Sequence, residues 1–169
     1  MSSAYERELK NILEAEQKTL KKVTTSLEPL ARDDYLRIKD KPFIVVRAAG
    51  SFGFDLVAIR GDMSFLIEIK TSIFDTLHFS STDGKLQQQA DKMQIDCEKT
   101  RTLPIYAFRL KNYRGDSWKI FTIDIHGLEG RSRILHNQLP KLERSTKGNY
   151  IMRWNEGLPL AKFIHYLCR

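Results

Sequence analysis

Asp55, Glu68 and Lys70 interrupt a stretch that is otherwise rich in apolar side chains, FDLVAIRGDMSFLIEIK. Carboxylates are hard oxygen donors of the kind that hold Mg²⁺ or Mn²⁺. Such a metal lowers the pKa of a water and screens charge at a phosphate, and an adjacent lysine can orient that water or stabilise the transition state. The main-chain carbonyl of Ile69, between Glu68 and Lys70, is a natural further ligand. The group indicates metal-assisted phosphodiester hydrolysis.

Two expected strands, 54–60 and 63–71, position these side chains. Gly61-Asp62 connects them and is short enough for a hairpin. Alternation along the second strand places the glutamate and the lysine on one face. Pairing about the turn sets Asp55 opposite Glu68 or one residue from it, so the three side chains can converge at one end of a sheet. The same pattern also fits a solvated edge pair with the aspartate in a turn.

Helices are expected on either side of this hairpin. Residues 4–20 have apolar positions near helical spacing, and a second helix over 27–38 has Pro29 in its first turn. Residues 73–83 are polar and predict a loop. Residues 85–101 predict another helix, because four apolar side chains recur at steps of four, three and four residues: Leu86, Ala90, Met93 and Cys97.

The remaining strands are expected at 42–49, 103–110, 117–125 and 149–154, followed by a helix over 158–168. The segment 126–148 is polar and basic and is expected to be partly mobile. The apolar face of the last helix fits either a subunit interface or core packing; it consists of Leu160, Phe163, Ile164 and Leu167. The fold class predicted is α/β, with a mixed central β-sheet flanked by helices.

Composition is consistent with one domain of 169 residues, with 41% hydrophobic and 29% charged residues. No apolar run is long enough to span a bilayer and none resembles a signal segment, so a cytoplasmic location is expected, with no membrane partner. Two cysteines without close spacing cannot build a zinc site by themselves. The net charge of +7 favours polyanionic partners such as nucleic acid.

The chain resembles the PD-(D/E)xK nuclease superfamily, and more closely the archaeal Holliday junction resolvase family. The resemblance rests on ERELKNILEAE (6–16), FIVVRAAGS (43–51), DLVAIR (55–60) and LIEIK (66–70), and continues more weakly through LPIYAFRL and the final strand and helix. It implies a restriction-endonuclease-like fold. It also implies a Mg²⁺-dependent endonuclease, for which Mn²⁺ can substitute, that acts as a homodimer in DNA recombination and repair and cuts paired strands of a four-way junction.

The resemblance also implies roles for individual residues. Asp55 and Glu68 would be metal ligands and Lys70 the catalytic lysine. Glu6 would complete the site through water, with Glu8, two residues further along the same helix, as the alternative. The residues expected to contact DNA are Arg47 and Ser51 beside the scissile phosphate, and Lys10, Arg131 and Arg133 on the backbone elsewhere.

Two departures from the family leave alternatives open. Residues 17–41 are inserted between the first helix and the first strand, and the basic segment near 126–148 is extended. Either could reshape the surface that binds DNA. A nuclease of the same superfamily that acts on duplex, flap or single-stranded DNA therefore remains an alternative, as does a DNA-binding module without catalysis.

Overall fold

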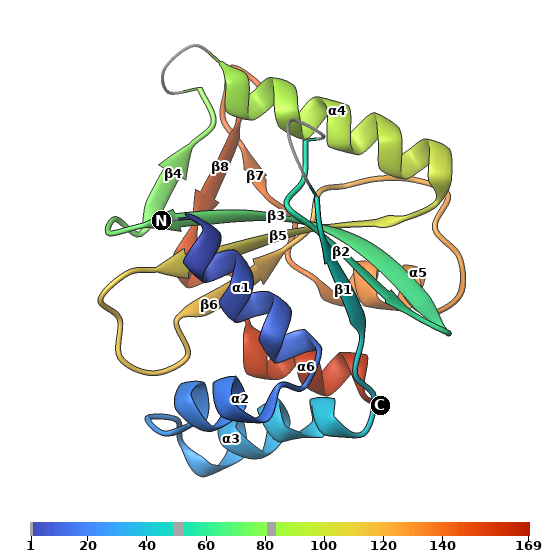
Figure 1. The fold of residues 1–169 in the computed structure, drawn as a ribbon. Coiled ribbons are helices and arrows are strands. Elements are labelled where there is room, and N and C mark those ends of the chain that lie inside the picture. The colour runs from blue at the N-terminus through green and yellow to red at the C-terminus, as the bar shows by residue number, and fades with distance from the viewer. Residues whose placement is uncertain (1, 49–52, 81–83) are drawn as a thin grey trace.

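Helices cover both faces of a central sheet in the computed structural model, which describes residues 2–48, 53–80 and 84–169. Figure 1 shows α4 on one side of the sheet and α1, α2, α3 and α6 on the other. The helices are α1 (Ser2–Leu13), α2 (Gln17–Thr24), α3 (Pro29–Leu36), α4 (Lys85–Thr100), α5 (Gly130–Gln138) and α6 (Leu160–Leu167), with 3-10 turns η1 (Arg37–Lys39) and η2 (Trp154–Glu156). Within these described residues, no helix has both the length and the apolar character needed to cross a membrane.

The strands of the described chain form two sheets. The larger has six strands in the order β1-β2-β3-β5-β6-β9, and the smaller has three in the order β4-β8-β7. Only β3 and β5 pair in parallel in the larger sheet, so the predicted mixed α/β class is confirmed. The strands are β1 (Ile44–Arg47), β2 (Leu56–Arg60), β3 (Met63–Ser72), β4 (Thr76–His78), β5 (Leu103–Leu110), β6 (Trp118–Phe121), β7 (Glu143–Arg144), β8 (Tyr150–Arg153) and β9 (Leu158–Pro159).

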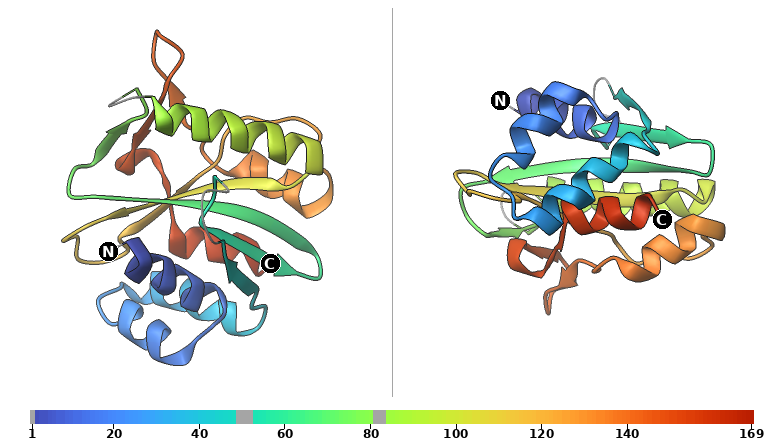
Figure 2. Two further views of the ribbon diagram at one scale, coloured as in Figure 1. Left: turned by 45° about the horizontal axis from the view of Figure 1, so that its top comes forward. Right: turned by 90° about the horizontal axis from the view of Figure 1, so that it is seen from below.

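β3 lies inside the sheet and is covered on both faces, as the two views of Figure 2 also show. One face belongs to the core, because the Phe65 ring meets the Phe163 ring of α6 with centroids 5.8 Å apart. The other face turns toward α4, because the Lys70 ammonium donates a hydrogen bond to Gln89 of that helix. Alternation along one strand therefore separates an apolar set from a polar set.

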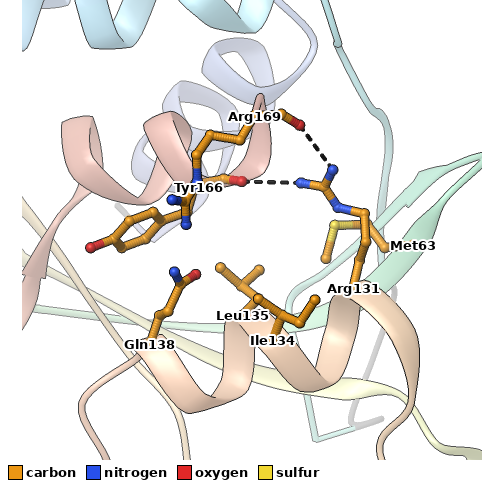
Figure 3. Close-up of a pocket in the computed structure, with 7 residues that line it drawn as sticks. All are labelled: Met63, Arg131, Ile134, Leu135, Gln138, Tyr166 and Arg169. Carbon is orange, nitrogen blue, oxygen red and sulfur yellow. Dashed lines mark hydrogen bonds between the residues drawn. The ribbon is translucent and has the colours of Figure 1, made fainter.

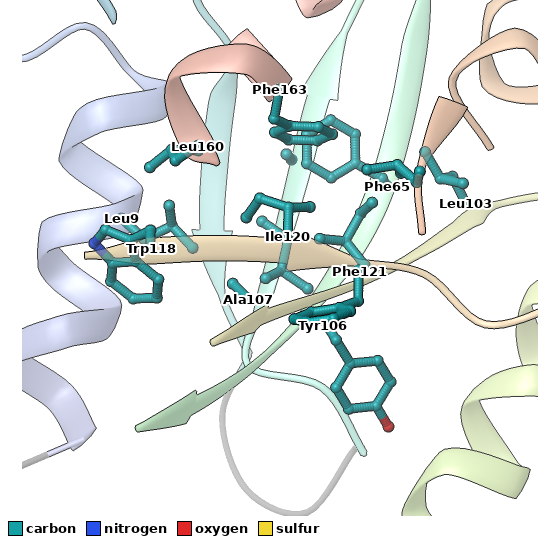
Figure 4. Packing of buried hydrophobic residues seen from close by; sticks show 14 of the residues in the cluster. Leu9, Phe65, Leu103, Tyr106, Ala107, Trp118, Ile120, Phe121, Leu160 and Phe163 are labelled. Carbon is teal, nitrogen blue, oxygen red and sulfur yellow. The ribbon is translucent and has the colours of Figure 1, made fainter. Parts of the chain in front are cut away.

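The core packs between the sheet and α6 (Figure 4). Phe163 and Leu160 of α6 point toward the strands, while Tyr106 of β5 points to the opposite side. The four residues of the predicted apolar face of α6 are each at most 1% exposed, which identifies that face as core: Leu160, Phe163, Ile164 and Leu167. Of the two interpretations of the last helix, core packing is therefore the one that the structure supports.

The single helix predicted over 4–20 is wrong, because the chain breaks between α1 and α2. Ala15 adopts a left-handed conformation with φ of 60°, which ends α1. Glu16 then caps α2, since its carboxylate accepts the N–H groups of Lys18 and Thr19 at 3.1 and 2.8 Å. The break turns α2 back so that Leu20 is buried against the core. The predicted helix over 27–38 is confirmed as α3 with η1.

Two segments expected to be irregular contain regular structure. The predicted loop at 73–83 includes β4, which pairs with β8 in the smaller sheet. The segment 126–148 was expected to be partly mobile, but it forms α5 and β7, with Leu135 and His136 buried. The strand expected over 117–125 is shorter, since β6 ends at Phe121. Each difference depends on partners that are distant in the sequence.

Replacing Gly157 by alanine is expected to lower the free energy of unfolding by about 1–3 kcal/mol, the usual cost of forcing extra atoms into a packed site. An added Cβ would lie 2.5 Å from the Lys119 Cβ and 2.7 Å from the Phe121 ring, where β9 approaches β6. Gly61→Ala is the matched control, because nothing lies within 4 Å of its added Cβ. Urea unfolding of both variants checks this. Equal stability for the two would show that β9 can move away from β6 at little cost.

Candidate active site

The hairpin places Asp55 beside Glu68. Leu56 of β2 pairs with Ile67 of β3, and the same register carried one residue further sets Asp55 opposite Glu68. Two backbone contacts fix the aspartate: its N–H donates to the Ile67 carbonyl at 2.8 Å, and its Oδ2 accepts the Ile69 N–H at 2.7 Å. The predicted hairpin register is confirmed.

Glu68 is a carboxylate buried at the inner end of this group, with only 4% of the residue exposed. Its Oε1 accepts a hydrogen bond from the Lys70 ammonium at 3.0 Å. Its Oε2 is buried and has no hydrogen-bond partner among the described residues. Burial, with the charge of Asp55 adding to it, raises the pKa of Glu68 to about 7, although Lys70 acts in the opposite direction. The metal-free site therefore holds Glu68 partly protonated at neutral pH.

Asp55 shows the same effect more weakly. Burial raises the pKa of Asp55, and the charge of Glu6 raises it further, while the hydrogen bond from the Ile69 N–H opposes both. Both carboxyl groups therefore have raised pKa values, and a cation bound between them would stabilise their ionised forms.

The donor set fits a hard divalent cation. A cation at the pair would give the buried Glu68 Oε2 a partner and would offset the repulsion between Asp55 and Glu68. Over the described ranges, however, no three His, Cys, Asp or Glu side chains are grouped closely enough to hold a metal by themselves. The residues therefore fit a site in which two carboxylates are supplemented by other oxygens. The Ile69 carbonyl remains the predicted further ligand.

The two glutamates of α1 point to different places. Glu6 accepts two hydrogen bonds from the Arg47 guanidinium, at 2.8 Å from Nη2 and 3.3 Å from Nε, and its charge acts on Asp55. Glu8 instead accepts from Arg109 Nε at 3.0 Å and Trp118 Nε1 at 2.8 Å. Of these two glutamates, Glu6 is therefore the one whose charge reaches Asp55. While its carboxylate is hydrogen-bonded to Arg47, Glu6 can act on a metal at Asp55 only indirectly.

Lys70 has a second partner that the sequence reasoning did not assign. Its ammonium donates to the Gln89 side-chain oxygen at 3.1 Å as well as to Glu68. Gln87, Gln88 and Gln89, which are consecutive in the sequence of α4, fit either phosphate contacts or a solvated helix face on sequence grounds alone. Gln89 lies directly before Ala90 and three residues after Leu86, at the edge of the apolar face of this helix. That position is the sequence signal that could have identified it.

Tyr106 is a further buried polar residue next to Glu68. The parallel register of β3 and β5 pairs the two residues, and the tyrosine hydroxyl lacks a partner among the described residues. Burial, followed by the charge of Glu68, raises the pKa of Tyr106 well above its usual value. No local sequence signal marks this residue, because its place depends on a strand pairing that spans a helix.

The basic residues predicted to contact DNA have different surroundings. Arg47 is held by Glu6 at the edge of the site, and Lys10 forms an ion pair with Glu14 one helical turn along. Ser51 lies outside the described residues. DNA contact by these residues stays a prediction.

Arg131 lies at the other end of β3, beside a pocket of about 430 Å³ between α5 and α6 (Figure 3). Its guanidinium donates to the carbonyls of Tyr166 and Arg169, at 3.1 and 2.9 Å. Arg133 is exposed on α5. The structure does not bring these two arginines together with Asp55 and Glu68, and of the described candidate catalytic residues none lines this pocket: Glu6, Asp55, Glu68 and Lys70.

Comparison with known proteins gives a likeness of structure alone. No protein-family model matches the chain, and no curated protein matches it. Among solved structures, Hjc from Archaeoglobus fulgidus, a Holliday junction resolvase from an archaeal hyperthermophile, matches with a TM-score of 0.50 and 19% sequence identity. The match covers 80% of this chain and 92% of the resolvase chain. The chain therefore has a fold similar to that of an archaeal Holliday junction resolvase.

Proposed function

We propose that this chain is a Mg²⁺-dependent, structure-selective DNA endonuclease that resolves four-way junctions by paired phosphodiester hydrolysis. The observation that carries the proposal is the convergence of Asp55, Glu68 and Lys70 at one end of the β2–β3 hairpin, within a fold similar to that of a resolvase. A salt-bridged strand edge would not need a buried carboxylate oxygen without a partner, which costs stability.

The carboxylates of Asp55 and Glu68 would hold the metal, with the Ile69 carbonyl as a further ligand and Glu6 acting through water. Mn²⁺ can take the place of Mg²⁺. When bound, the ion supplies positive charge at the scissile phosphate and makes a water more acidic. Glu6 is available for this role when Arg47 moves to the phosphate, because the same guanidinium cannot fully serve both anions.

Lys70 directs the reaction geometry. Its ammonium keeps one N–H beyond those given to Glu68 and Gln89, and this N–H orients the attacking water or a phosphate oxygen. The water oxygen bonds to phosphorus in line as the bond to the 3′ oxygen breaks. The attacking water gives one proton to solvent, and the departing 3′ oxygen takes one proton from solvent. The products are a 5′-phosphate and a 3′-hydroxyl.

Two symmetric cuts on one junction require two sites, so the proposal includes a homodimer in which each chain, 1–169, is a single nuclease domain. Backbone phosphates would be contacted by Lys10, Arg47, Ser51, Arg131 and Arg133. The net charge of +7 supports such contacts. DNA as the substrate places the protein in the cytoplasm with the nucleoid.

The test compares a labelled four-way junction with a linear duplex of matching arms, with and without Mg²⁺. Wild type is expected to make paired nicks in the junction alone. Asp55→Asn keeps an oxygen for the Ile69 N–H but removes the charge, and it is expected to lower the cleavage rate at least about 100-fold. Asp75→Asn, at an exposed aspartate, is the matched control.

Each other outcome points to a different function. Equal cutting of junction and duplex, or preference for flap or single-stranded DNA, would keep the nuclease and remove the junction claim. Binding without any cutting in Mg²⁺ or Mn²⁺ would indicate the non-catalytic DNA-binding module.

A further inference from the structure

Gln89 stands apart from its two neighbours on α4. Gln87 contacts the smaller sheet, since its side-chain oxygen accepts the Tyr150 N–H of β8 at 2.7 Å. Its side-chain nitrogen donates to Asp91 on the same helix at 2.9 Å. Gln88 is exposed. Gln89 alone of these three turns to the Lys70 ammonium, at 3.1 Å. Three identical side chains in a row thus have three different environments, and only one meets the candidate active site.

A lysine ammonium carries three N–H donors on a flexible stem and has no acceptor. The contact with Glu68, two residues away on the same strand, directs one of these N–H groups and leaves the other two free to rotate about that hydrogen bond. A second acceptor on another element removes that freedom. With two N–H groups directed at Glu68 and Gln89, the direction of the third is fixed.

The neutral amide suits this place. A carboxylate at position 89 would add a further negative charge beside Asp55 and Glu68, whose pKa values burial already raises. Gln89 also borders an open groove of about 350 Å³ between Gly53 and α4, so the contact lies at an edge that a substrate can reach.

We infer that Gln89 is a positioning residue for phosphodiester cleavage, holding the Lys70 ammonium so that its remaining N–H points at the reacting group. The inference rests on the proposed nuclease function and adds α4 to the elements that build its site. Gln89 does not itself touch the phosphate in this assignment.

The test uses Gln89→Met, which keeps the length of the side chain and removes the acceptor. Gln94→Met on the same helix is the matched control, because Gln94 contacts Glu98 and the Asp124 carbonyl instead of Lys70. The single-turnover cleavage rate at saturating protein is expected to fall about 10-fold in Gln89→Met, the effect of losing one hydrogen bond to a charged group. DNA affinity measured in Ca²⁺ and the thermal midpoint should match those of Gln94→Met.

A second measurement does not depend on activity. The ¹H–¹⁵N signal of the Lys70 ammonium is expected in wild type and Gln94→Met, where hydrogen bonds slow its exchange with water, and is expected to broaden in Gln89→Met. Unchanged cleavage and an unchanged signal in Gln89→Met would overturn the inference. A loss confined to DNA affinity would also overturn it, because Gln89 would then bind substrate directly.

Failure of the proposed function gives a separate pattern. If wild type cuts no DNA in Mg²⁺ or Mn²⁺, a role in cleavage is lost for every residue of the site, Gln89 included. The ammonium signal would then still report whether Gln89 holds Lys70.

Discussion

Replacing Glu68 by glutamine is expected to stabilise the metal-free protein at pH 8 while abolishing cleavage. Burial raises the pKa of this carboxyl to about 7 from an ordinary value of 4.5, so the folded state resists ionisation that the unfolded chain accepts. That difference corresponds to on the order of 3 kcal/mol lost by the wild type once the group is fully ionised. Glutamine has the same shape, carries no charge and still offers an oxygen to Lys70.

The pH dependence has a definite sign. Because the folded-state pKa lies above the unfolded one, the stability tied to Glu68 is fully present below about pH 4.5 and is lost as pH rises through about 7. The variant should therefore exceed wild type by less than about 1 kcal/mol at pH 5 and by about 3 kcal/mol at pH 8. Urea unfolding in EDTA at the two pH values measures this. Glu156→Gln, at a glutamate whose side chain is 56% exposed, is the control and should show neither effect.

A bound cation should reverse the order of stability. Mn²⁺ binding to the folded state alone stabilises wild type by mass action, by about 4.1 kcal/mol at one thousand times the dissociation constant, which exceeds the lead of about 3 kcal/mol that the variant has at pH 8. The glutamine variant lacks one of the two carboxylates and should gain little. Equal stability of wild type and variant at both pH values in EDTA would mean that water reaches Glu68 freely. In that case the buried acidic pair would no longer explain the site.

Much of the site could be predicted because its geometry is local. Gly61-Asp62 is too short a connection to allow many registers, and a register shift by one residue would exchange the two faces of β3. Asp55, Glu68 and Lys70 were therefore placed by one turn and by alternation. The helix over 85–101 was similarly clear, since its apolar positions recur over about three turns.

The remaining elements depend on contacts that no local pattern contains. β4 and β7 have three and two residues, too few for alternation to be recognised. α5 buries Leu135 and His136 but leaves Ile134 59% exposed, so its apolar pattern does not mark one face. The break at Ala15 is set by a left-handed residue that is not glycine, which sequence rules rarely predict.

The same division explains the site residues that were left open or missed. Glu6 and Glu8 are equivalent as helix residues, and the choice between them follows from how α1 packs on β5 and β6 through Arg109 and Trp118. Gln89 reaches Lys70 from an element nineteen positions away in the chain. Long-range packing, which fixes these side chains, is the part that sequence patterns do not encode directly.

Lys70→Ala is expected to reduce cleavage by about 10³-fold or more, the range found when a group that stabilises charge or transfers protons in the transition state is removed. The fold should survive, because Glu68 can stay protonated when its partner is lost. Lys70 now opposes the rise in the pKa of Glu68, so that pKa should increase further in the variant. DNA affinity in Ca²⁺, the thermal midpoint and cleavage of the junction are the measurements, with Lys99→Ala, at an exposed lysine of α4, as control.

Two roles of Lys70 can be separated by the pH dependence of the remaining activity. If the lysine only keeps Glu68 ionised for metal binding, raising the pH above the new pKa of Glu68 should restore cleavage in Lys70→Ala. If its third N–H also directs water or a phosphate oxygen, the defect should persist even above that pKa, where Glu68 is ionised without Lys70. We expect the defect to persist, because Gln89 fixes the ammonium in a direction that ion pairing with Glu68 alone would not require. Full recovery at high pH would show that Lys70 acts only as an electrostatic partner of Glu68. The hydrogen bond from Lys70 to Gln89 would then have no role in cleavage.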